Sequence, residues 1–164
     1  MFYKILPFIL LVNFSFAQTS LELPKNEVIL EVTGNISLTN EDDFAIFDAD
    51  MIDQLPQYTI NTSNHVSNNI SVYTGINFYD LLKMLGFKGS LVNITAWDDY
   101  VVQIEIQDLK KYGVLLATHE NGQRLTINDK GPMFVVFPFT DIEELRRDDY
   151  YNMSIWQVKE IDVE

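Results

Sequence analysis

The sequence predicts an α+β fold, in which a few short helices accompany a mostly antiparallel or mixed β-sheet. Runs of strand-type residues outnumber the helical patterns along the chain. Most of these runs are separated by only a few residues, as at Asp98-Asp99, which is too short for a parallel crossover. A third observation is the segment 130–138, where Gly131-Pro132 precedes the apolar residues 134–137 and Pro138 ends the run. Such a run is typical of a short strand buried on both faces, so we expect it at the centre of the sheet.

The remaining strands follow from alternation and from turn residues. They are expected at residues 27–32, 58–62, 70–73, 91–97, 100–106, 114–118, 124–127 and 154–163. Within 100–106, the even-numbered residues from Tyr100 to Ile106 share one face of the strand. Asn121-Gly122 is the dipeptide preferred in tight hairpin turns, so it should join the strands on either side of it.

Capping residues mark the helices. Asp48 is expected to cap a short helix that ends before Pro56, and Asn77 to cap a clearer helix over 78–85 that ends at Gly86. A helical turn is expected at 108–112 and a short charged helix at 141–147.

The chain begins with the pattern of a secretory signal peptide. Lys4 precedes an apolar stretch over 5–17, which closes on Ser15-Phe16-Ala17, with small residues where a signal peptidase reads. The stretch of about 13 residues is shorter than the roughly 20 that a spanning helix needs. We therefore expect export to the periplasm or the medium, cleavage before Gln18, no membrane insertion after cleavage, and one domain over 18–164.

Composition excludes several kinds of function. The formal net charge is −13, and loss of Lys4 with the leader makes it one unit more negative. Such acidity argues against nucleic acid as a partner, because phosphate binding needs a basic surface. The sequence has no Cys, which rules out disulfides, thiolate nucleophiles, Cys-ligated zinc and iron–sulfur clusters. It has only two His, so no metal site is expected.

A set of segments carries a family resemblance through its order and spacing. The segments are YTGINFYDLL at 73–82, AWDDY at 96–100, LLAT at 115–118 followed by Asn121-Gly122, KGPMFVVFP at 130–138, and WQVKEI at 156–161. Together they resemble the oxidoreductase molybdopterin-binding domain, the catalytic fold of sulfite oxidase. The resemblance implies a sulfite-oxidase-like molybdopterin-binding fold in a short, exported version without the dimerisation domain of full sulfite oxidases. It also implies molybdopterin as the family cofactor.

The resemblance is uneven at the cofactor site. In the family a Cys thiolate binds molybdenum from the loop that corresponds to 61–65, but this chain has no Cys. An Arg is typical of the family at the place of Phe134. Tyr100 matches the family's active-site Tyr, which faces substrate oxyanions, and is the one catalytic candidate. Because oxygen ligands do not replace a soft thiolate on molybdenum, no bound cofactor is expected here.

The candidate ligand-binding residues surround the groove that the resemblance implies. They are Thr62, Ser63, His65, Trp97, Asp98, Asp99, Tyr100 and Lys130. They offer an aromatic face, hydrogen-bonding groups and one cation, which together suit a small ligand. We expect Tyr100, Lys130 and His65 to line one shared concavity.

Three functions are compatible with these observations. The first is a degenerate, non-molybdenum binding module for a small molecule, or for a membrane sensor or other partner protein. The second is an active molybdopterin-dependent oxidoreductase with a Cys-free metal site. The third is a purely structural or interaction role, which no sequence feature favours or excludes. The missing Cys, the missing Arg and the acidic charge place the binding module first.

Overall fold

A computed structural model describes residues 21–64 and 69–164 of the chain. Within those residues the strands are β1 (Val28–Gly34), β2 (Ala45–Asp48), β3 (Gln57–Thr62), β4 (Ser71–Asn77), β5 (Leu91–Ala96), β6 (Val101–Glu105), β7 (Leu115–Glu120), β8 (Gln123–Arg124), β9 (Phe134–Val136) and β10 (Val158–Val163). The helices are α1 (Ala49–Gln54), α2 (Phe78–Met84), α3 (Ile106–Tyr112), α4 (Asp148–Met153) and the 3-10 helix η1 (Glu143–Leu145). The predicted α+β class is confirmed.

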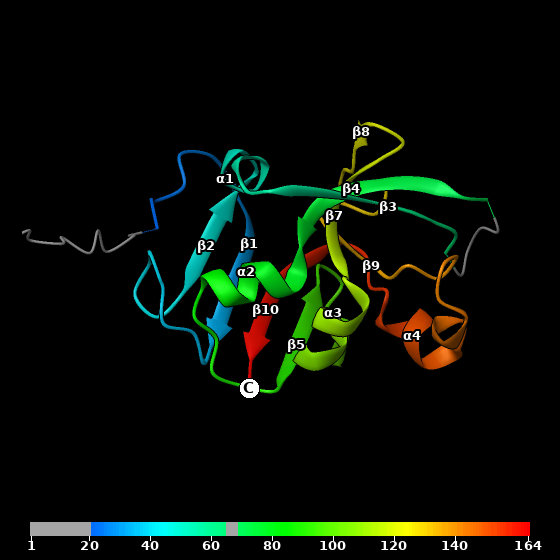
Figure 1. Ribbon diagram of the computed structural model, residues 1–164. Coiled ribbons are helices and arrows are strands. Elements are labelled where there is room, and N and C mark those ends of the chain that lie inside the picture. The colour runs from blue at the N-terminus through cyan, green and yellow to red at the C-terminus, as the bar shows by residue number, and fades with distance from the viewer. Residues whose placement is uncertain (1–20, 65–68) are drawn as a thin grey trace, which may run out of the picture.

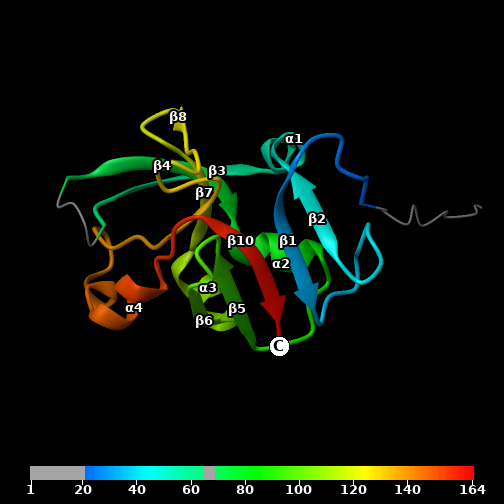
Figure 2. The same cartoon turned by 180° about the vertical axis from the view of Figure 1, so that it is seen from behind.

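Two sheets organise these elements (Figure 1). The first has the strand order β2-β1-β10-β5-β6 and is mixed, because β1 runs parallel to β10 while its other pairs are antiparallel. The second has the order β3-β4-β7-β8, with β9 also paired to β7, and all of its pairs are antiparallel. Seen from the opposite side, the long β3–β4 hairpin extends away from the first sheet (Figure 2). The chain therefore combines the mixed and antiparallel pairing that its short connections predict.

The predicted helix caps are present. The Asp48 carboxylate accepts a hydrogen bond from Met51 N at 2.9 Å, and the Asn77 amide oxygen accepts one from Asp80 N at 3.0 Å. Each cap satisfies a backbone donor that the first turn of a helix leaves free. The α3 helix begins at Ile106, earlier than expected, and ends where Gly113 takes a left-handed conformation with φ 61°.

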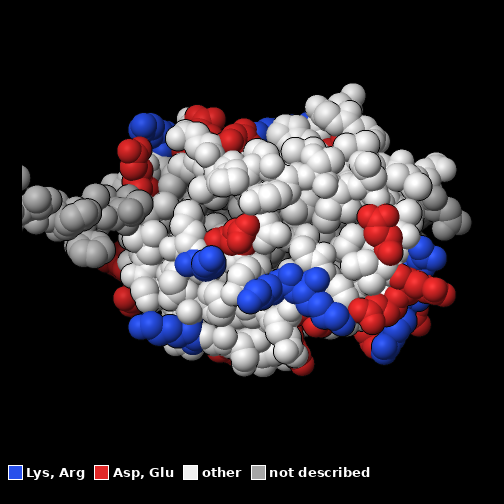
Figure 3. Space-filling model, viewed as in Figure 1, with Lys and Arg blue, Asp and Glu red and all other residues white. Residues whose placement is uncertain are grey.

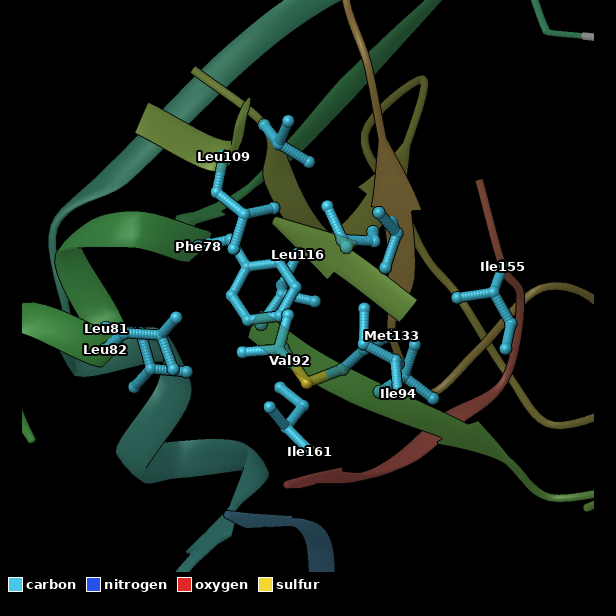
Figure 4. Packing of buried hydrophobic residues seen from close by; sticks show 14 of the residues in the cluster. Phe78, Leu81, Leu82, Val92, Ile94, Leu109, Leu116, Met133, Ile155 and Ile161 are labelled. Atoms are coloured by element: carbon cyan, nitrogen blue, oxygen red, sulfur yellow. The ribbon is translucent and has the colours of Figure 1, made fainter. Parts of the chain in front are cut away.

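The main core is formed by side chains of the first sheet and of the helices α2 and α3, together with Ile76 of β4, Leu116 of β7 and Val135 of β9 from the second sheet. Figure 4 shows Phe78 and Leu116 pointing toward Met133, with side chains of the first sheet around them. The buried residues labelled there are Phe78, Leu81, Leu82, Val92, Ile94, Leu109, Leu116, Met133, Ile155 and Ile161. A smaller cluster, which includes Tyr73 and Phe134, lies on the second sheet.

The segment 130–138 occupies a different place from the one predicted. Its strand β9 is fully buried, but it is not central, because it pairs with β7 alone among the strands. Its other edge is covered by irregular chain: Val135 N donates to Ile155 O at 3.0 Å, and Ser154 Oγ donates to Val135 O at 2.6 Å. Burial of both faces is therefore compatible with an edge position, provided that a loop satisfies the free backbone groups.

Other boundaries also differ from the sequence-based expectation. The strand β2 and the helix α4 were not expected, and the strand after the Asn-Gly turn is only β8 rather than 124–127. The segment 141–147 contains η1 alone, and β10 starts at Val158 instead of 154. The Asn121-Gly122 turn itself is confirmed, since both residues have the positive φ that this hairpin type requires, 51° and 78°.

Charge is distributed unevenly over the surface. Residues 57–79, which include β3 and β4, contain no Asp, Glu, Lys or Arg. The space-filling view in Figure 3 accordingly shows a largely uncharged upper right face, with Lys, Arg, Asp and Glu concentrated elsewhere. No helix in the described part of the chain is long and apolar enough to cross a membrane. The predicted signal peptide over 1–17 lies outside the described residues, so export stays a prediction.

Candidate ligand-binding site

A cavity of about 320 Å³ lies between the β5–β6 turn and the segment 151–157. The charged, amide and aromatic side chains that line it are Asp98, Tyr100, Tyr151, Asn152, Trp156 and Gln157. We call this hollow the turn cavity. Its size falls within the range of about 300–1,000 Å³ that is usual for small-molecule pockets. Its lining combines three aromatic side chains with amide and carboxylate groups.

One wall of the turn cavity is the tight turn from Ala96 to Tyr100. Asp99 has the left-handed φ of 64°, and the Asp98 carboxylate accepts a hydrogen bond from Tyr100 N at 3.2 Å. Ala96 N closes the turn by donating to Tyr100 O at 2.9 Å. The Asp99 carboxylate is held by Lys159 Nζ at 2.6 Å, and this hydrogen bond lowers the Asp99 pKa below its ordinary value. The turn is thereby fastened to β10.

The opposite wall depends on Gln157, a non-glycine residue with φ 52°. Its backbone N donates to Lys130 O at 3.0 Å, and its backbone O accepts from Trp97 N at 3.0 Å. Its side-chain amide donates to Ile127 O at 2.6 Å. A left-handed conformation is costly for a residue with a Cβ, so it persists only where the surroundings hold it. These contacts hold the wall, including Trp156, in one position.

A chain of polar side chains beside the turn cavity links Tyr73 of β4, Glu120 of β7 and Lys130. Asn64 Nδ2 donates to Tyr73 Oη at 2.9 Å, and Tyr73 Oη donates to Glu120 Oε1 at 3.0 Å. The Lys130 ammonium donates to Glu120 Oε2 and also lies 5.9 Å from the centre of the Trp156 ring. The Lys130 and Glu120 side chains are 16% and 18% exposed, so their ion pair is largely withdrawn from water.

Burial and hydrogen bonds together determine the pKa values of Glu120 and Lys130. Burial alone raises the Glu120 pKa, but hydrogen bonds from Lys130, Ser71 and Tyr73 outweigh burial and lower that pKa below its ordinary value. Burial opposes the charged form of Lys130, yet the bond to Glu120 raises the Lys130 pKa. Burial is the largest cause of a raised Tyr73 pKa. The pair is therefore charged near neutral pH, and the Lys130 charge is already balanced by Glu120.

The structure brings some of the predicted site residues together. Asp98 and Tyr100 line the turn cavity, and Tyr100 is 51% exposed. Trp97 and Asp99 belong to the same turn without being part of the lining, and Trp97 is 50% exposed. Lys130 is not part of the lining, but its ammonium lies 5.9 Å from the centre of the Trp156 ring and its backbone O accepts from Gln157 N. The binding role of these residues stays a prediction.

Other predicted site residues lie apart from the turn cavity. Thr62 is the last residue of β3 in the second sheet and is fully buried, and Ser63 follows it. Thr62 Oγ1 accepts from Thr140 N at 3.1 Å, and Ser63 N donates to Thr140 Oγ1 at 3.0 Å. Both residues therefore hold the 139–141 segment in place. His65 lies outside the described residues, so its expected place beside Tyr100 is untested.

Several lining residues, among them Tyr151, Asn152, Trp156 and Gln157, were not predicted as part of a site. Tyr151 and Asn152 belong to α4, which has no apolar periodicity to reveal it, and Gln157 has no residue-type signal for its left-handed conformation. Trp156 was noticed only as part of a family segment.

Comparison with known proteins identifies a solved structure with a similar fold. No family model matches the chain, and none of the curated proteins matches it. Among solved structures, the crystal structure of the sulfane dehydrogenase SoxCD from Paracoccus pantotrophus superposes with a TM-score of 0.63 at 16% identity. The match covers 88% of this chain and 40% of the SoxCD chain. The two proteins share a fold, in keeping with the sulfite-oxidase-like fold that the sequence motifs predict.

The residues present do not fit a molybdenum-bearing pterin held by a protein thiolate. The sequence has no Cys, and the loop where the family places one contains the buried, hydrogen-bonded Thr62. Phe134, at the family's Arg position, is fully buried against Tyr73 and Trp156. Over residues 21–64 and 69–164, no three His, Cys, Asp or Glu side chains gather as metal ligands would. Lys130 is the nearby cation, and it is paired with Glu120.

Proposed function

We propose that this chain is an exported binding module, formed by a single molybdopterin-binding-like domain over 18–164, which takes a small molecule into the turn cavity. The observation that carries the proposal is the cavity itself, where Asp98 and Tyr100 meet Trp156 in a volume suited to a small ligand. A membrane sensor or another partner protein would then respond to the occupied module. A shared fold does not establish a shared activity, so the proposal rests on the residues of the site.

The construction of the cavity supports this proposal. Both walls are held by backbone hydrogen bonds, from Ala96 N to Tyr100 O on one side and from Gln157 N to Lys130 O on the other. A ligand that enters a cavity of this kind does not have to order the chain first. Preorganisation of that sort increases affinity by lowering the entropy lost on binding.

We expect Asn152→Tyr to weaken small-molecule binding by at least about tenfold, because the larger side chain fills the cavity and removes about 1.4 kcal/mol of contacts. Asn152 lines the cavity and is exposed on α4. The measurement is an NMR screen of the isotope-labelled protein with soluble fragments that are cationic, uncharged or anionic. Binding should shift the amide signals of Tyr100 and Gln157.

The matched control is Asn61→Tyr, which places the same side chain at an exposed position of β3, outside the lining. Its fragment affinities should equal those of the parent. The proposal is contradicted if no fragment of any charge shifts the signals around the cavity. It is also contradicted if Asn152→Tyr and Asn61→Tyr have the same fragment affinities.

A second candidate function is an active molybdopterin-dependent oxidoreductase with a Cys-free metal site. The fold shared with a sulfane dehydrogenase favours it, as does the position of Tyr100 at the cavity. We expect protein purified from its native compartment to contain far less than one molybdenum per chain, because no thiolate is present to bind the metal. Elemental analysis with a pterin assay measures this. Near-stoichiometric molybdenum with oxidase or reductase turnover would favour the enzyme instead.

Export is the part of the proposal that rests on the sequence alone. The charged start, the apolar stretch over 5–17 and the small residues Ser15 and Ala17 motivate it. Amino-terminal sequencing of the mature protein should begin at or near Gln18. Recovery of the protein from the cytoplasm with Met1 or the whole leader retained would contradict export.

A further inference from the structure

The lining of the turn cavity has an unusual balance of charge and aromatic surface. Tyr100, Tyr151 and Trp156 contribute three aromatic side chains, and Asp98 contributes a carboxylate. No Lys or Arg belongs to this lining. Aromatic faces carry partial negative charge, so they add to the effect of a carboxylate.

The two cations near the cavity are already balanced. Lys159 is bonded to Asp99 at 2.6 Å, and Lys130 is bonded to Glu120. Asp98, by contrast, forms no ion pair with any Lys or Arg in the described part of the chain. The local field at the lining is therefore negative, and the net charge of −13 adds to it at longer range.

From this balance we infer that the turn cavity binds a small organic cation, such as a substituted or quaternary ammonium compound. The inference rests on the proposed binding function and specifies the chemical class of its ligand. The cation would lie against the ring of Tyr100, with Asp98 as its counter-charge, because the Trp156 ring already has the Lys130 ammonium 5.9 Å from its centre. Recognition of quaternary ammonium groups by aromatic side chains uses the same attraction between a cation and a ring face.

An anionic ligand is disfavoured for the same reasons. It would meet the Asp98 carboxylate and the ring faces, and the nearby ammonium groups would have to leave Asp99 or Glu120 to reach it. Breaking a largely buried pair such as Lys130–Glu120 leaves an uncompensated charge behind, which is costly. An uncharged ligand would gain burial but not the electrostatic attraction.

Three probes of one shape and different charge test the inference. They are tetramethylammonium chloride, tert-butanol and sodium pivalate, each titrated into the exported protein at constant ionic strength. Trp156 lines the turn cavity and Trp97, the other Trp of the chain, belongs to the adjoining turn, so intrinsic fluorescence reports on the site. Trp97→Phe leaves Trp156 as the fluorophore in the lining. Calorimetry gives the affinities independently.

We expect tetramethylammonium to bind at least about tenfold more tightly than tert-butanol, with pivalate the weakest of the three. Tyr100→Leu and Asp98→Asn should each reduce the preference for the cation by about threefold or more, with little change for tert-butanol. The matched controls are Tyr58→Leu, at a Tyr that is 44% exposed on β3, and Asp43→Asn, at an exposed carboxylate outside the lining. Neither control should alter the preference.

The inference fails if tert-butanol or pivalate binds as tightly as tetramethylammonium, or if tetramethylammonium does not bind. These outcomes are distinguishable from failure of the binding function. When uncharged or anionic fragments occupy the cavity and Asn152→Tyr excludes them, the module binds a ligand of another class. When no fragment binds there at all, both the proposed binding function and the inference are contradicted.

Discussion

Phe137→Ala should lower the free energy of unfolding by about 3–5 kcal/mol, the range typical of truncating a buried aromatic residue. Phe137 is fully buried, with its ring centroid 5.8 Å from that of Phe139 and 5.7 Å from that of Tyr150. The substitution removes the ring and leaves a cavity that only partly collapses. Denaturant unfolding followed by circular dichroism measures the loss.

The control for this prediction is Phe44→Ala, because Phe44 is 38% exposed and its truncation leaves no enclosed void. A loss well below that of Phe137→Ala is expected there. Phe139 also packs on Tyr151, a residue of the turn cavity, at 4.8 Å between ring centroids. Phe137→Ala should therefore weaken ligand binding as well as stability. An equal effect of both truncations would show that the ring cluster does not carry this stability.

Lys130→Met should lower the free energy of unfolding by about 3 kcal/mol near neutral pH, because it leaves the Glu120 carboxylate withdrawn from water without its cation. Met retains most of the aliphatic length of Lys, so the loss reports mainly on the charge. Tyr73 still donates to Glu120 in the variant, which limits the effect. The matched control is Lys25→Met, since the Lys25–Glu22 pair is 83% and 81% exposed and should contribute little.

Acidification should reduce the difference in the free energy of unfolding between Lys130→Met and the parent. In the parent the Glu120 pKa is below its ordinary value of 4.5, so its contribution is present above that pH and is lost as the pH falls further. Without Lys130, only the hydrogen bonds from Ser71 and Tyr73 oppose the effect of burial, so the Glu120 pKa is higher than in the parent and the carboxyl becomes protonated at a higher pH. Unfolding measured from neutral pH down through 4.5 checks this. A difference that stays constant or grows on acidification would contradict the assigned pairing.

Prediction from sequence succeeded where a few neighbouring residues decide the structure. The side chains of Asp48 and Asn77 cap their helices as expected, and Asn121-Gly122 makes the predicted hairpin turn. The alternation along β6 is also present, with Val102 and Ile104 buried on one face of the strand. Each of these features depends on contacts only a few positions apart, so local chemistry determines it.

The two walls of the candidate site differ in the same way, because one depends on neighbouring residues and the other on distant ones. The turn that carries Asp98 and Tyr100 is visible in the sequence as a short polar break between two strands. Its opposite wall is not, because the position of Gln157 depends on hydrogen bonds to Lys130 and Trp97 from distant parts of the chain. The partner of Lys130 was equally hidden, since Glu120 reaches it only through the packing of the second sheet.

The sequence by itself determined the absence of a thiolate, the acidic charge, the capped helices and the tight turns, because each follows from residue identity or from local contacts. Only the tertiary structure decided that β1 pairs in parallel with β10, that β9 lies at an edge and that 151–157 closes the turn cavity. These features depend on which of several apolar surfaces pack together. That choice is a property of the whole core, and short-range residue patterns do not encode it.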